Sequence, residues 1–162
     1  MLISSFTQTY GENRILELML LKYDIVGNTF RNKCDMIIFS FHNCSNKFIE
    51  TGVKILEDIY PKEKLKILQY TNINYLESIR KTLIFLKENN IDYILQIQDD
   101  QHGINSMETI HTLHDIDDIF SFLTRKQPSL LHIFSNEGNP NYNGLIPLEK
   151  NKEINTNTTF YS

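Results

Sequence analysis

The sequence has few of the features that mark several large protein classes. It contains only two cysteines, Cys34 and Cys44, which are too few for a disulfide framework or a complete zinc site. No apolar run is long enough to span a membrane, and no basic segment precedes an apolar stretch near the first residues. We therefore expect a cytoplasmic chain with no membrane span.

A strongly basic balance is also missing. The formal net charge is −4, whereas proteins that bind nucleic acid usually carry a basic face, so we expect no nucleic-acid partner. The 162 residues, 41% of them hydrophobic, suffice for one ordinary core but not for two comfortable domains. We expect a domain over residues 1–136 and an extended polar tail over residues 137–162, where Asn, Gly, Pro and Thr are frequent.

Short apolar runs alternate with longer segments of helical periodicity. This order is typical of an α/β domain with a mostly parallel central sheet and helices on both faces. The sequence predicts strands over residues 2–7, 35–41, 64–70, 92–98 and 129–136, and helices over residues 13–30, 46–60 and 75–89. A Rossmann dehydrogenase is disfavoured, because no G-x-G-x-x-G follows the first expected strand.

The second and third expected helices have recognisable starts. Ser45 is a candidate N-cap, and the apolar face expected after it consists of Phe48, Ile49, Val53, Leu56 and Ile59. Asn74 followed by Glu77 resembles a capping box. The helix after it is predicted to turn an apolar stripe toward the core, consisting of Leu76, Ile79, Leu83 and Leu86.

Polar residues gather just after three of the expected strands, where open α/β sheets bind ligands. They are Thr7, Gln8, Thr9 and Tyr10 after the first strand, His42 and Asn43 after the second, and Asp99 and Asp100 after the fourth. The adjacent carboxylates repel each other, and burying either one unpaired is unfavourable. Mg²⁺ or Mn²⁺ together with substrate phosphates would compensate them, so the rim suits a nucleotide with metal-bound phosphates.

The segments "SSFTQTYG", "IIFSFHN" and "ESIRKTLIFLKENNIDYILQIQDD" resemble the nucleotide-binding half of a GT-A fold glycosyltransferase of the family 2 type. The resemblance covers roughly residues 2–103 and implies a three-layer, Rossmann-like fold. It implies a nucleotide-diphospho-sugar donor, UDP- or GDP-linked, held with Mn²⁺ or Mg²⁺. An unknown hydroxyl compound would accept the sugar.

The same resemblance assigns roles residue by residue. The DxD-like frame is Gln98-Asp99-Asp100, which makes Asp100 the metal ligand and places Asp99 near the metal and the sugar or ribose. Arg80, in "SIRK", corresponds to a phosphate-contacting arginine. No catalytic base can be assigned, because little of the chain follows the motif. The alternatives are a fragment of an enzyme and a non-catalytic nucleotide-sugar-binding or interaction module of the same fold.

Simpler interpretations exist for several of these residues. Arg80 could pair with Glu77, and His42 could satisfy backbone groups at the end of its strand. The acidic pair could be a solvated turn. The polar cluster His111, His114, Asp115, Asp117 and Asp118 has metal-compatible spacing, but the start of a polar helix explains it better. A phospho-receiver domain is disfavoured, because its acids would follow the first strand.

Overall fold

The computed structural model describes residues 1–97, 116–118, 120–121, 123–125, 132–135 and 158–161. The chain forms two compact units, Met1–Ile104 and Asn105–Ser162. The boundary expected from the sequence, between a domain and a polar tail, falls later, between residues 136 and 137. Asp99, Asp100, His111, His114 and Asp115 lie outside the described residues, whereas Asp117 and Asp118 of the same polar cluster are described and exposed.

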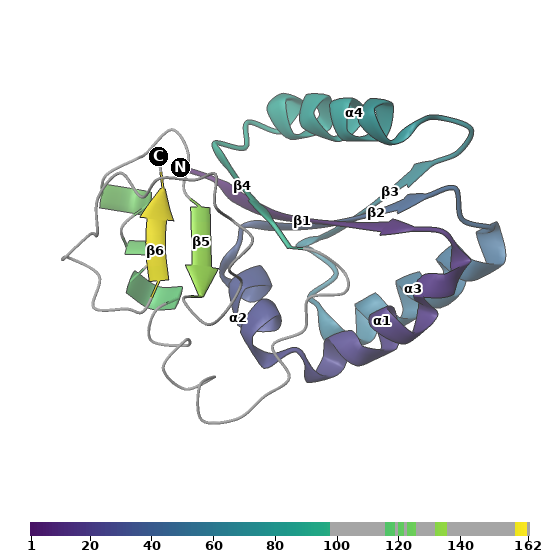
Figure 1. Ribbon diagram of the computed structural model, residues 1–162, viewed down its shortest axis with the longest axis horizontal. Helices are drawn as coiled ribbons and strands as arrows, with labels where there is room; N and C mark the ends of the chain where they lie inside the picture. The colour runs from purple at the N-terminus through teal and green to yellow at the C-terminus, as the bar shows by residue number, and fades with distance from the viewer. Residues whose placement is uncertain (98–115, 119, 122, 126–131, 136–157, 162) are drawn as a thin grey trace. The chain divides into compact units, whose positions relative to one another are not determined.

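The first unit is an α/β fold with four parallel strands in the order β3-β2-β1-β4. Figure 1 shows helix α4 on one face of this sheet and α1, α2 and α3 on the other. The strands are β1 (Ile3–Tyr10), β2 (Met36–His42), β3 (Leu65–Tyr70) and β4 (Tyr93–Gln96). The helices are α1 (Ile15–Leu20), α2 (Ile25–Lys33), α3 (Asn46–Ile59) and α4 (Tyr75–Glu88), with short 3-10 turns at η1 (Glu12–Arg14) and η2 (Leu21–Tyr23).

The second unit contains a two-stranded antiparallel sheet of β5 (His132–Ser135) and β6 (Thr158–Tyr161). β5 falls within the strand predicted over residues 129–136, but it pairs with β6 and not with the parallel sheet. β6 shows that part of the expected polar tail forms a strand. No helix in the described part of the chain is long and apolar enough to cross a membrane.

The two faces of the sheet have different cores. Phe39 and Phe41 of β2 pack with Leu18 of α1 and Leu56 of α3, and all four side chains are buried. The opposite face holds a smaller cluster made by Phe6, Ile38 and Leu86. Because adjacent residues of a strand point to opposite faces, this division decides which β1 side chains face which helices.

Helix α3 confirms the interpretation of its local sequence. Ser45 Oγ accepts a hydrogen bond from the Phe48 backbone N–H at 3.3 Å, which satisfies one donor of the first turn. Phe48, Ile49 and Leu56 are buried, and the helix ends at Ile59 with Tyr60 as its C-cap, directly before Pro61. The predicted cap and most of the predicted apolar face are therefore correct.

The predicted first helix, residues 13–30, is interrupted. Asp24 leaves the helical conformation with ψ 77° and caps α2 by accepting from the Gly27 N–H at 2.9 Å. The cap divides the segment because a side-chain acceptor at this position satisfies the first turn of a new helix. Met19 in α1 and Ile25 at the start of α2 are exposed, while Leu18 and Leu21 are buried.

Helix α4 begins where the sequence predicted, but its inward face is different. Asn74 Oδ1 accepts from the Glu77 N–H at 2.8 Å. The buried side chains are Ser78, Thr82 and Leu86, whereas Leu76 and Leu83 are 76% and 49% exposed. The predicted apolar stripe is therefore wrong at Leu76 and Leu83, correct at Leu86, and partly correct at Ile79, which is half-buried.

A polar layer explains this rotation of α4. The Ser78 hydroxyl accepts from Gln8 Nε2 of β1 at 2.8 Å, and Thr82 Oγ1 lies 3.0 Å from the Tyr70 hydroxyl of β3. Small hydroxyl side chains on α4 can pair with polar groups at the ends of the strands, as Ser78 does with the Gln8 amino group and Thr82 with Tyr70. The apolar half of the interface is confined to the C-terminal end of α4, around Leu86.

Candidate functional site

The candidate site is the carboxyl edge of the parallel sheet, where β1, β2 and β3 end in Tyr10, His42 and Tyr70. The connections from β1 to β2 and from β2 to β3 run over one face, and the connection through α4 runs over the other (Figure 1). The direction of winding therefore changes between β1 and β4. In open α/β sheets, ligands bind at such a change.

The four β1 residues singled out in the sequence fall on two faces. Thr7 and Thr9 pair in register with Phe39 and Phe41, so their side chains lie on the face covered by α1 and α3. Thr7 is 1% exposed and its hydroxyl accepts from Arg31 Nη2 at 3.4 Å, while Thr9 is 0% exposed. This placement gives both threonines a place in the interior rather than on the rim.

Gln8 and Tyr10 lie on the other face of β1, toward α4. Gln8 is held by Ser78, and the Tyr10 ring is 55% exposed at the end of the strand. Tyr10 packs edge-on against the His42 imidazole, with 4.9 Å between ring centroids. The rim thus presents an accessible aromatic ring supported by a buried one.

His42 is a fixed part of the site. Its side chain is 1% exposed, and Nε2 lies 2.7 Å from the Ile73 carbonyl oxygen. A carbonyl oxygen can only accept, so Nε2 must carry the proton. His42 therefore ties the end of β2 to the loop before α4, which is the backbone-satisfying role considered from the sequence.

Asn43 continues this connection. Its backbone has φ 54°, a left-handed conformation that asparagine adopts more readily than most residues. Its N–H donates to the Tyr70 carbonyl at 2.8 Å, and its Oδ1 accepts from the Asn72 N–H at 3.1 Å. The ends of β2 and β3 are thus joined by side-chain and backbone bonds together.

Arg80 forms the pair with Glu77 that the simpler interpretation of the sequence described. Its Nε and Nη2 donate to the two Glu77 carboxylate oxygens at 2.8 and 2.6 Å. The hydrogen bond from Arg80 is the main reason that the pKa of Glu77 is lowered. Arg80 would have to leave this exposed pair before it could contact a phosphate.

An amide-rich groove lies at the ends of β2 and β3, with a volume of about 700 Å³. Both helix caps, Ser45 and Asn74, contribute to it. The lining residues are Asn43, Cys44, Ser45, Thr71, Asn72, Ile73 and Asn74. We call this feature the amide groove.

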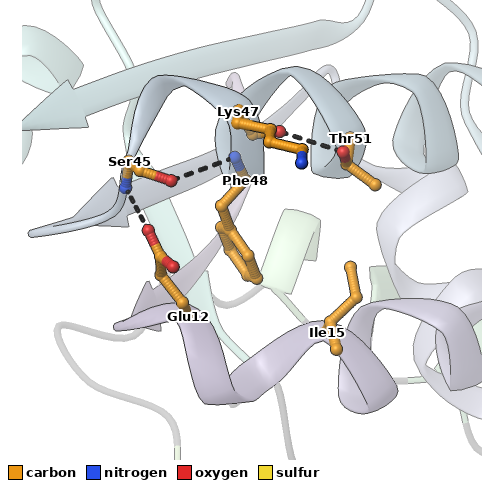
Figure 2. Close-up of a pocket in the computed structure, with 6 residues that line it drawn as sticks. All are labelled: Glu12, Ile15, Ser45, Lys47, Phe48 and Thr51. Carbon is orange, nitrogen blue, oxygen red and sulfur yellow. Dashed lines mark hydrogen bonds between the residues drawn. The ribbon is translucent and has the colours of Figure 1, made fainter.

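A second depression of about 330 Å³ lies between α1 and α3, and Figure 2 shows its lining. Ile15 and Phe48 supply its apolar side chains, and Glu12 and Ser45 lie at one end. Glu12 Oε1 accepts from the Ser45 N–H at 2.9 Å. A carboxylate of the chain itself therefore occupies the N-terminus of α3, where its negative charge is favourable.

The Glu12–Ser45 contact should make the stability of the protein depend on pH. Hydrogen bonds from the Ser45 hydroxyl and N–H lower the pKa of Glu12 below its ordinary value of 4.5. A lowered pKa in the folded state adds stability above the unfolded pKa, and this stability disappears as the pH falls through the folded value. We expect the melting-temperature difference between the wild type and Glu12→Gln to shrink between about pH 6 and about pH 3.

Thermal unfolding at several pH values measures this difference. The control is Glu50→Gln, because Glu50 is exposed on α3 and makes no comparable cap. A difference that stays constant over the whole range would mean that the ionised Glu12 carboxylate does not stabilise the N-terminus of α3.

The described residues contain no group of three His, Cys, Asp or Glu side chains that could hold a metal ion. The expectation of Mn²⁺ or Mg²⁺ therefore depends on Asp99 and Asp100. Both cysteines are free and buried, and burial raises the pKa of the Cys34 thiol to about 12. Neither thiol is placed as a nucleophile or a metal ligand.

No family model matches the chain, and no curated protein is significantly similar to it. The sequence had pointed to single residues after each strand. It did not reveal the amide groove, which depends on the loop before α4 bending back to His42 and Asn43. The only signal for the groove was the pair of asparagines, Asn72 and Asn74, that flank Ile73.

Proposed function

We propose that the first unit binds a nucleotide-diphospho-sugar, UDP- or GDP-linked, at the carboxyl edge of its sheet. The chain would then be a GT-A-like glycosyltransferase, or the donor-binding part of one. The observation that carries the proposal is the change of winding direction between β1 and β4. β1 ends in the exposed Tyr10 ring, and the chain reaches Asp99 and Asp100 just after β4.

Each residue has a distinct part in this proposal. The exposed face of Tyr10 stacks on the base, since aromatic rings stack on bases without hydrogen-bond recognition. The buried His42 imidazole supports the Tyr10 ring through their edge-on contact. Asp100, with Asp99, would hold a divalent cation that neutralises charge on the diphosphate.

Titration calorimetry with UDP and GDP, with and without Mn²⁺, tests the proposal. We expect binding that Mn²⁺ strengthens, and we expect Asp100→Ala to lose the Mn²⁺-dependent part. Tyr10→Ala should weaken binding about tenfold with or without metal, since stacking a base on an aromatic ring contributes about 1–3 kcal/mol. Asp58→Ala, an exposed acid on α3, is the matched control for lost charge.

Absence of binding for both nucleotides under every metal condition would contradict the proposal. Binding that is equal in the wild type and Asp100→Ala would contradict the metal role alone.

A second candidate is a non-catalytic module that keeps the donor site. Glu12, in the turn that follows β1, is already hydrogen-bonded to the N-terminus of α3, so it is not poised as a general base. Binding of the donor without sugar transfer or donor hydrolysis would favour this module.

A further inference from the structure

The amide groove has the properties of a ligand site of its own. It is an open cavity of about 700 Å³, within the size range of small-molecule sites. None of its lining side chains carries a formal charge. Most of its polar groups are amides and hydroxyls, which can both donate and accept hydrogen bonds.

Two of the asparagines in the groove have fixed orientations. Asn43 Oδ1 accepts from the Asn72 N–H, and Asn74 Oδ1 accepts from the Glu77 N–H. A backbone N–H can bond only to the oxygen of the side-chain amide, so these contacts decide which way each amide faces. The Nδ2 amino groups of Asn43 and Asn74 therefore remain as donors, and neither bonds another residue in the described part of the chain.

The backbone around these donors is rigidly held. Asn43 and Asn72 both adopt left-handed conformations, with φ 54° and 56°. The His42–Ile73 and Asn43–Tyr70 hydrogen bonds fix the two sides of the groove relative to each other. A ligand would therefore meet donors that are already in place, which reduces the entropy lost on binding.

The charge around the groove favours a neutral ligand over an anion. Ser45 lines the groove, and its N–H is already bonded to the Glu12 carboxylate. The positive end of α3 is thus neutralised by the chain, and an anion in the groove would approach this negative charge. No lysine or arginine lines the groove to offset the repulsion.

We propose that the amide groove binds a neutral saccharide. Sugar hydroxyls can accept from the Nδ2 groups of Asn43 and Asn74 and exchange hydrogen bonds with Thr71 and the Asn72 amide. Ile73, which is partly buried, offers an apolar contact for the C–H face of a pyranose. The inference deepens the proposed function by naming a saccharide as its second ligand, but saccharide binding itself requires no nucleotide.

Side-chain NH₂ signals in ¹⁵N correlation spectra of the full chain test the proposal directly. The probes are maltose, lactose and cellobiose, with inorganic phosphate as the anionic comparison and no nucleotide present. We expect at least one disaccharide to shift the Asn43 and Asn74 NH₂ signals saturably, and phosphate to leave them unchanged. Because nucleotide is absent, failure here is distinguishable from failure of the donor site in the calorimetric titrations.

Asn74→Asp separates ligand contact from helix capping. Aspartate keeps an oxygen to accept from the Glu77 N–H, and it caps helices about as well as asparagine. It removes the Asn74 NH₂ group, with its two N–H donors, and introduces a negative charge. We expect saccharide binding to weaken about tenfold, since the variant loses a hydrogen bond and adds an unpaired charge, while the melting temperature stays close to that of the wild type.

The control is Asn32→Asp, which introduces the same charge on the exposed end of α2. If Asn74→Asp lowers the melting temperature, Asn43→Asp takes its place in the binding test. The proposal is overturned if no disaccharide shifts the two NH₂ signals, or if phosphate binds with higher affinity than any disaccharide. It is also overturned if the aspartate variant that stays folded binds the disaccharide as tightly as the wild type does.

Discussion

Asp24→Ala should lower the free energy of unfolding by about 3–5 kcal/mol, because it would leave the Arg31 guanidinium buried beside no carboxylate. Both side chains of the pair are essentially inaccessible, at 1% and 0% exposed, and Asp24 Oδ2 lies 3.0 Å from Arg31 Nη1. The variant also loses the cap on the Gly27 N–H. Urea unfolding followed by circular dichroism measures the loss.

The rest of the Arg31 environment cannot compensate for Asp24. Thr7 Oγ1 is a long acceptor at 3.4 Å, the Tyr60 hydroxyl interacts with the guanidinium as a neutral group, and the Phe39 ring lies 5.6 Å from the guanidinium carbon. A neutral hydroxyl and a ring face stabilise a desolvated cation less than a carboxylate does. Arg31 is thus stable in the interior because Asp24 is there.

Two further variants make this prediction specific. Asp58→Ala removes an exposed acid from α3 and should change the stability by less than about 0.5 kcal/mol. Replacing both partners, as Asp24→Ala with Arg31→Met, should be less destabilising than Asp24→Ala alone, because no buried charge remains. If Asp24→Ala alone lowers the free energy of unfolding by less than about 1 kcal/mol, the ion pair is not buried in the folded protein.

Gly27→Ala should also destabilise the protein, by about 2–4 kcal/mol, although the same change inside a helix ordinarily stabilises it by up to about 1 kcal/mol. A Cβ at position 27 would lie 2.7 Å from Asp24 Cγ and 2.8 Å from Arg31 Nη1. The ion pair would have to open or α2 would have to shift. Thermal and urea unfolding give the sign of the change.

The reason for the effect can be tested by combination. In the Asp24→Ala background the obstructing carboxylate is absent and only the end of the flexible Arg31 side chain remains close, so Gly27→Ala should then be much less destabilising. Asn32→Ala, at an exposed position of α2, reports what alanine contributes to this helix without a close contact. If Gly27→Ala destabilises equally in both backgrounds, the contact with Asp24 is not its cause.

The ion pair also bears on the candidate site. Arg31 connects α2 to Thr7 of β1, and β1 is the strand that carries Gln8 and Tyr10 to the rim. The β1 residues that face α1, α2 and α3 hold the strand, whereas Tyr10, on the face toward α4, is exposed at the end of the strand. Variants of Asp24 or Gly27 that remain folded are therefore expected to weaken ligand binding only indirectly.

How far the sequence predicted the fold depended on how local each signal was. Ser45 and Asn74 cap helices through bonds to backbone groups three residues away, so both starts could be predicted correctly. The interruption at Asp24 was missed, because its importance comes from Arg31, seven residues later, and from the burial of both side chains. Apolar spacing alone continued the helix through it.

The α4 error has a similar origin. Leu76 and Leu83 have helical spacing, and in isolation they indicate an inward stripe. The face that turns inward is decided by what the sheet offers, which near the carboxyl edge is Gln8 and Tyr70. Matching polar groups across that interface exposes the leucines, and no pattern within the helix contains this information.

The sequence by itself determined the alternation of strands and helices, the caps of α3 and α4, and the position of an acidic pair after the fourth strand. These follow from local hydrogen bonding and from the periodicity of side chains along one segment. Only the tertiary structure decided which face of β1 meets which helices, and that Arg31 and His42 are buried. It alone brought Asn43 and Asn74 together at one groove, because contacts between residues distant in sequence depend on how strands pair and on which side each connection crosses.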